Sequence, residues 1–199
     1  MTHVDAPDPW IGAKFASSQL RLLVVGESHY DIPEVDLKDL TQYVVRHFAK
    51  ADSHNAFFTP VTEFQKTSEM FSHMDRPDVW DTIAFANFIA RPLRDWRERP
   101  VAHDIKQSLS SFRARVLGVQ PTHIALFSTI AWNAIPNREG KYRGDNQGTI
   151  FEWHVDGKFD ALCAKFPHPS HGHLTRTLQS AQASLGLLLQ HSQDAHRTF

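Results

Sequence analysis

The sequence predicts an α/β protein: a three-layer α/β/α sandwich with a short, mainly parallel central sheet. Short apolar runs alternate along the 199 residues with segments whose apolar side chains recur at helical spacing. Strands that alternate with helices are typical of a parallel sheet covered on both faces. The run at residues 20–26 is mostly apolar on both faces and includes the β-branched Val24 and Val25, as expected of a central parallel strand. The length favours one domain spanning residues 1–199.

The first half of the chain adds two helices and one strand. Asp36 is a typical N-cap, and apolar residues follow it at helical spacing. They are Leu37, Leu40, Val44 and Phe48. Thr59-Pro60 predicts a second helix, because proline is favoured at the first helical position. Residues 82–88 then form a second apolar run, which predicts a buried strand.

The second half repeats the alternation. Asp104 is expected to cap a helix that Gly118 and Pro121 end. Its buried stripe comprises Ile105, Leu109, Phe112 and Val116. Further expectations are a strand at 123–127, a short helix at 130–135, a polar loop at 137–148 and a last helix at 174–189. Asp156-Gly157 predicts a hairpin between strands at 149–155 and 158–166.

Composition narrows the class of protein. A formal net charge of −1 disfavours a general polycation that coats nucleic acid, although a local basic groove is compatible with it. The single cysteine, Cys163, excludes an intramolecular disulfide and a four-cysteine metal or iron–sulfur site within this chain. No apolar stretch approaches 18 residues, and no secretory signal is apparent, so a cytoplasmic protein is expected.

Two short motifs follow apolar runs far apart in the sequence. Gly26-Glu27-Ser28-His29-Tyr30 follows the first strand, and Pro167-His168-Pro169-Ser170-His171-Gly172 follows the last. Ligands bind at the carboxyl ends of the strands in an open parallel sheet. The two motifs therefore predict a single site that combines a carboxylate with an imidazole.

These motifs resemble those of the uracil-DNA glycosylase superfamily. The first is similar to a catalytic motif that reads G-Q-D-P-Y in one branch and G-E-A-P-G in another. Phe85-Ala86-Asn87-Phe88 resembles the strand that presents a base-reading asparagine, and His168-Pro169-Ser170 matches the start of the second catalytic motif, H-P-S. Residues 117–126, followed by Ala131, are similar to the third helix–strand unit of that family. Together the similar segments span most of residues 20–189.

The resemblance implies a monomeric enzyme that acts on DNA and hydrolyses the N-glycosidic bond of a flipped-out nucleotide, with no cofactor and no metal. Glu27 would position water and stabilise the sugar cation, and His168 would stabilise the departing base. Asn87 would read the base, and an aromatic ring, Phe57 or Phe58, would stack on it. The remaining expected substrate contacts are Gly26, Ser28, Tyr30 and Ser170, and the expected DNA contacts are His171 and Arg176.

Because the sequence departs from the family pattern, it does not identify which base is excised. Ser28 occupies the position of the water-activating aspartate of one branch, so activity depends on Glu27. Tyr30 matches the tyrosine that excludes a 5-methyl group, but His29 replaces the proline of that turn. The expected substrate is therefore uracil or a modified pyrimidine, including a modified cytosine of foreign DNA.

Other functions also fit parts of the sequence. An inactive module that binds DNA or a modified base would keep the fold without the chemistry. A metal-dependent hydrolase would use histidines and an aspartate of the two motifs, namely His29, Asp31, His168, His171 and His173. A serine hydrolase would pair Ser28 with His168. Four arginines between 91 and 99 alternate with Asp95 and Glu98, which predicts a solvated face rather than a phosphate site.

Overall fold

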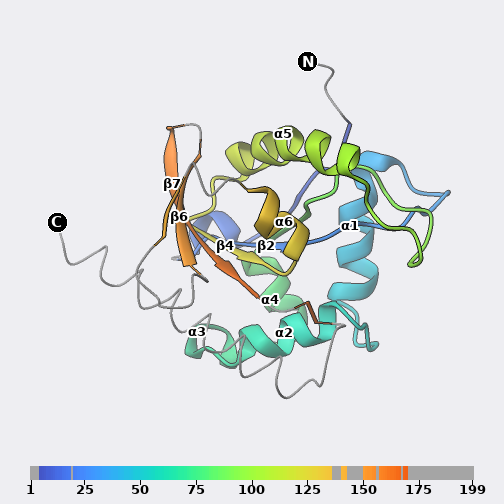
Figure 1. Cartoon of the computed structure of the whole chain (residues 1–199). Helices are drawn as coiled ribbons and strands as arrows, with labels where there is room; N and C mark the ends of the chain where they lie inside the picture. The colour runs from blue at the N-terminus through green and yellow to red at the C-terminus, as the bar shows by residue number, and fades with distance from the viewer. Residues whose placement is uncertain are drawn as a thin grey trace.

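A computed structural model describes residues 5–18, 20–135, 140–142, 150–155, 157–166 and 168–169. It confirms the α/β class. The described strands form one mixed sheet of seven strands in the order β1-β3-β2-β4-β7-β6-β5 (Figure 1). They are β1 (Trp10–Ile11), β2 (Leu22–Gly26), β3 (Ala84–Asn87), β4 (His123–Leu126), β5 (Gly140–Tyr142), β6 (Ile150–Val155) and β7 (Phe159–Lys165).

The four central strands, β3-β2-β4-β7, are parallel, and the strands at both edges are antiparallel. Their register aligns the carboxyl ends. Gly26 pairs with Asn87 across β2 and β3, and Leu126 pairs with Lys165 across β4 and β7. Residues that follow these strands are therefore delivered to one edge of the sheet, as the two sequence motifs require.

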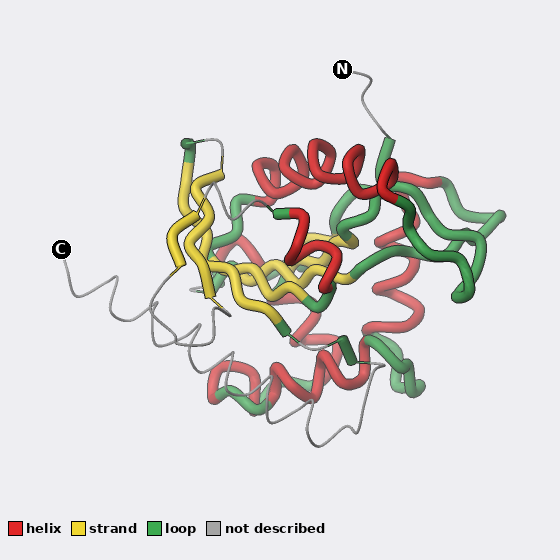
Figure 2. The backbone as a smooth tube through the Cα atoms, in the orientation of Figure 1, coloured by secondary structure: helices red, strands yellow, loops and turns green. Residues whose placement is uncertain are grey.

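Helices cover both faces of this sheet (Figure 2). They are α1 (Leu40–Val44), α2 (Phe58–Lys66), α3 (Glu69–Ser72), α4 (Arg76–Thr82), α5 (Ala102–Val119) and α6 (Thr129–Ala134). Shorter 3-10 turns are η1 (Phe15–Ser17) and η2 (Leu37–Asp39), and α1 continues into a π-helical turn, η3 (Val45–Ala49). No helix among the described residues is long and apolar enough to cross a membrane.

Alternate residues of β2 enter two separate hydrophobic cores. Leu22 and Val24 pack with residues of α2, α3 and α4, whereas Leu23 and Val25 pack with residues of α5 and α6. Because successive strand side chains point to opposite faces, a strand that is apolar throughout must be covered twice. Each fully buried leucine or valine contributes about 1.5–3 kcal/mol through removal from water.

The predicted cap of α5 is wrong by three residues. Val101 precedes the helix, and Asp104 lies in its first turn, where Oδ2 accepts a hydrogen bond from the Val101 amide at 3.0 Å. At the other end the helix continues through Gly118 and stops at Gln120, whose left-handed φ of 52° ends it. The acidic first-turn residue thus satisfies a free amide without being the cap itself.

Four short elements were absent from the sequence prediction. They are β1, η1, α4 and β5, the last of which replaces part of the predicted loop at 137–148. The N-cap of α4 is Asp75, whose carboxylate accepts from the Asp78 amide at 2.9 Å. The predicted hairpin is confirmed, with β6 and β7 in antiparallel register and Gly157 at a φ of 64°. The helix predicted at 174–189 lies outside the described residues.

Candidate active site

Gly26 and Asn87 meet at the carboxyl edge of the sheet. A β-carbon added to Gly26 would lie 2.2 Å from Asn87 Oδ1 and 3.3 Å from Phe57 Cζ. The Asn87 side chain therefore occupies the space that glycine leaves. Asn87 is only 5% exposed, yet its carboxamide makes no hydrogen bond to the described part of the chain. A carboxamide without a protein partner can offer both a donor and an acceptor to the edge of a ligand.

Phe57 connects this pair to His168. Its ring is half-buried and lies 5.8 Å from the imidazole of His168, centroid to centroid. Asn55 fixes the start of α2, since its Oδ1 accepts hydrogen bonds from the amides of Phe57 and Phe58 at 2.9 and 3.0 Å. This Asx turn sets the direction of the Phe57 ring toward the sheet edge.

His168 reaches the same edge from β7. The Phe166 amide donates to the Leu126 carbonyl at 2.8 Å, which holds the end of β7 against β4. Phe166 also stacks on Phe127, with ring centroids 4.9 Å apart. Because β2 and β7 both pair with β4, their ends are separated by about 10 Å, the width of two strand spacings. Glu27 and His168 therefore follow strands that end on one side of the molecule.

Glu27 and Ser28 are half-buried. The backbone of Glu27 is fixed, because its carbonyl accepts from the Ile89 amide at 2.9 Å. Its carboxylate makes no ion pair or hydrogen bond with the described residues, and neither does the Ser28 hydroxyl. The main chain of Glu27 is thus held in place, and its carboxylate oxygens are available to a ligand or to water.

His29 turns into the protein. Its Nε2 lies 3.0 Å from Thr41 Oγ1, and its ring meets that of Phe85 edge-on. Burial, aided by the positive charge of Arg115, lowers the pKa of His29 from 6.5 to about 3. The imidazole is therefore neutral at physiological pH, and its role at this position is to pack beneath the first motif.

The buried neutral state of His29 predicts a pH-dependent stability. Between pH 6.5 and about 3 the unfolded chain binds a proton at His29 that the folded protein excludes, so stability falls as pH falls. From pH 7 to 5 this term costs about 2 kcal/mol. Urea unfolding at both pH values should show a smaller acid-induced loss for His29→Gln than for the wild type. Equal losses in the two proteins would contradict the assignment.

Arg115 is a site residue that sequence reasoning missed. From α5 it donates to the carbonyls of Asn87 and Phe88 at 2.8 and 3.1 Å. Burial lowers the pKa of Arg115 to about 10, so the guanidinium stays charged at neutral pH. It fixes the end of β3 and adds positive charge behind Asn87. The only sequence signal was a cation next to Val116, on the edge of the buried face of a helix.

Other predicted residues lie elsewhere or outside the described range. Phe58, an expected substrate contact, is a core residue instead: it is 5% exposed and packs edge-on against Trp80 and Phe85. The half-exposed neighbour Phe57 takes the place beside Asn87. Tyr30 is 49% exposed and is not enclosed with Asn87. The predicted contacts Ser170, His171 and Arg176 lie outside the described residues.

Within the described ranges, no three side chains of His, Cys, Asp or Glu gather closely enough to hold a metal ion. The candidate site residues Glu27, Asn87 and His168 thus lie at or just after the ends of β2, β3 and β7, and Phe57 lies at the start of α2, where its ring contacts that of His168. No protein-family model and no curated protein matches this chain.

Proposed function

We propose that this protein is a DNA glycosylase that hydrolyses the N-glycosidic bond of a flipped-out uracil or modified pyrimidine and leaves an abasic site. One observation carries the proposal: the carboxamide of Asn87, which has no hydrogen-bond partner among the described residues, lies against Gly26 and beside a Phe57 ring that also contacts His168. An amide, an aromatic face and an imidazole close to one another are groups that can bind a nucleobase.

Each group has a distinct part in binding the base. The carboxamide of Asn87 offers one acceptor and one donor side, which matches the polar edge of a pyrimidine. Phe57 supplies a flat apolar surface for stacking, and its neighbours in the core keep the ring in place. Gly26 is required because any side chain there would displace the carboxamide. Binding energy from these contacts offsets the unstacking of the nucleotide, which costs roughly a few kcal/mol.

The chemistry then needs a carboxylate and a donor. As the bond between C1′ and the base nitrogen breaks, the electron pair leaves with the base, and the sugar becomes cationic. Glu27 stabilises that cation and accepts a proton from the water whose oxygen bonds to C1′. An N–H of His168 donates to the carbonyl oxygen of the base, where negative charge develops. The released base takes up one proton, and the sugar retains the hydroxyl.

The proposal is tested with a panel of oligonucleotides that carry uracil, hypoxanthine, hydroxymethylcytosine or glucosylated hydroxymethylcytosine. After incubation with the protein, hot alkali cleaves the strand wherever a base has been removed. We expect cleavage at one or more of the pyrimidines and none in unmodified DNA. Binding to the same oligonucleotides without cleavage at any of them would instead identify an inactive binding module.

A further inference from the structure

The loop at residues 91–100 lies directly beside the first motif. Leu93 donates its amide to the His29 carbonyl and accepts from the Asp31 amide, both at 2.8 Å. Tyr30 and Leu93 form a parallel bridge that extends the pairing of β2 with β3 beyond the ends of both strands. In Figure 1 the green loop before α5 projects next to the blue segment that follows β2. Whatever binds the exposed side of this loop is adjacent to Tyr30 and to the edge of the candidate site.

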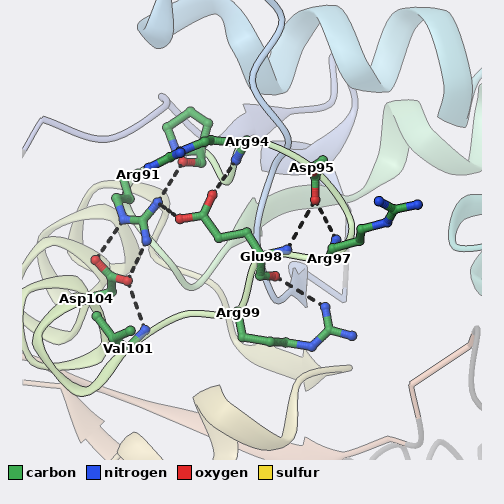
Figure 3. A network of polar contacts seen from close by, with 9 residues as sticks. Arg91, Arg94, Asp95, Arg97, Glu98, Arg99, Val101 and Asp104 are labelled. Carbon is green, nitrogen blue, oxygen red and sulfur yellow. Dashed lines mark hydrogen bonds and ion pairs between the residues drawn. The ribbon is translucent and has the colours of Figure 1, made fainter.

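An internal ion-pair network holds the loop closed (Figure 3). Arg91 makes a two-pronged contact with Asp104, with both N···O distances at 2.7 Å, and a third contact with Glu98 at 2.9 Å. The other oxygen of Glu98 accepts from the Arg94 amide at 2.6 Å. Hydrogen bonds from Arg91 and from the Arg94 amide lower the pKa values of Asp104 and Glu98, respectively. Both carboxylates are therefore paired with groups of the loop and of the start of α5.

The outward side chains are basic and aromatic. Trp96 is 64% exposed, and the Arg97 guanidinium lies 5.0 Å from the centre of its ring. Arg99 donates to the Trp96 carbonyl at 2.7 Å, and Arg94 is exposed. Asp95 is the one exposed acid within residues 91–100, and one of its oxygens accepts the amides of Arg97 and Glu98. The sequence predicted a solvated face, and Arg94, Arg97 and Arg99 are exposed, whereas Glu98 turns toward Arg91. Three exposed arginines therefore lie on the same short segment as the Trp96 indole.

We propose that this loop is a binding surface for single-stranded DNA, with Trp96 stacking on an unpaired base and Arg94, Arg97 and Arg99 contacting phosphates. An exposed indole next to several cations is the combination that single-strand binding uses, because every base has a face to stack and every linkage has a charge to neutralise. In a duplex the bases are already stacked, so only an unpaired base can use the indole. The net charge of −1 for the whole chain means that such binding must be local.

The proposal deepens the proposed function, since it names the form of DNA that would be presented to the site beside the loop. The ion pairs and hydrogen bonds around Arg91 hold the loop in one conformation, which lowers the entropy cost of binding DNA. A surface loop normally loses conformational freedom on binding, whereas this one is already fixed at Arg91, Leu93 and Glu98. The guanidiniums and the indole are thereby held on one short segment before DNA arrives.

Fluorescence anisotropy with a labelled, unmodified 20-nucleotide strand tests the surface without requiring any base release. Trp96→Ala should weaken binding at least about fivefold, as expected when one stacked base loses its platform. The combined variant R94A/R97A/R99A should weaken it further and reduce the salt slope of log Kd by about 0.7 for each phosphate that is no longer neutralised. Phe48→Ala and Arg46→Ala, which remove an exposed ring and an exposed cation in η3, should bind like the wild type.

Circular-dichroism melting establishes that the variants remain folded. The inference is overturned if the loop variants bind the strand as tightly as the two controls, or if duplex DNA or RNA of the same sequence binds more tightly than single-stranded DNA. Because the probe carries no modified base, failure of base excision leaves this result unaffected. Conversely, if the wild type releases bases but the loop variants bind the strand as tightly as the wild type, the loop proposal is wrong and the glycosylase proposal stands.

Discussion

Replacing Glu27 by Gln, or His168 by Ala, is expected to lower the single-turnover rate of base release at least about a hundredfold each. Glutamine keeps the shape of Glu27 but carries no charge to stabilise a cationic sugar and takes no proton from water. Alanine at 168 removes the donor to the departing base. The rates are measured on the best substrate of the oligonucleotide panel, with enzyme in excess.

Two measurements separate a defect in chemistry from a defect in folding. Affinity for the substrate strand should stay within a few-fold of the wild-type value, since neither side chain is needed for the backbone contacts. Serine at position 28 provides a matched control, because Ser28→Ala alters the same turn without removing a charge. A Ser28→Ala enzyme as impaired as Glu27→Gln would favour a serine nucleophile. Wild-type rates in both the Glu27 and His168 variants would place the active site elsewhere.

Gly26→Ala is expected to reduce kcat/KM for base excision roughly tenfold to a hundredfold while lowering stability by less than about 1 kcal/mol. The new methyl group would lie 2.2 Å from Asn87 Oδ1, which is the end of a side chain that can rotate away. The fold therefore accommodates the change, but the carboxamide no longer meets the base. Rates and thermal melting on the same preparation measure the two effects.

The other glycines supply the controls for this prediction. At Gly12 an added β-carbon would lie 2.3 Å from the main-chain carbonyl oxygen of Asp81, which has little freedom to move, so Gly12→Ala should lower the melting temperature. At Gly118 nothing lies within 4 Å, so Gly118→Ala should leave stability unchanged or slightly higher. Adding Asn87→Ala to Gly26→Ala should cost little more activity, because both changes remove one interaction. Fully additive losses would contradict the proposed contact.

The central strands were predictable because burial on both faces leaves a continuous apolar run, as in β2 and β4. The edge strand β1 has only two residues, too few to show any period. At α5 the rule for caps placed Asp104 outside the helix, whereas the same carboxylate serves the first turn from within it. The Asp104 carboxylate was therefore correctly expected to accept a free amide at the start of the helix, but the predicted helix start was three residues too late.

At the site, the motifs indicated Glu27, Asn87 and His168, and the register of the strands brings the segments that carry them to one edge. The choice between Phe57 and Phe58 depended on the rotation of α2, which adjacent aromatic residues do not reveal. Arg115 was hidden because a long-range contact to main-chain carbonyls leaves no pattern in the sequence. The same holds for Glu98, whose orientation decides the charge of the loop surface.

The most direct test is a crystal structure of the protein with an oligonucleotide whose target sugar carries a 2′-fluoro group, which slows hydrolysis. We predict a flipped base with the Asn87 carboxamide on its edge, Phe57 on its face and His168 within hydrogen-bonding distance of its carbonyl oxygen. Glu27 should face C1′. A nucleotide bound elsewhere, or one that touches Asn87 but neither Glu27 nor His168, would contradict it.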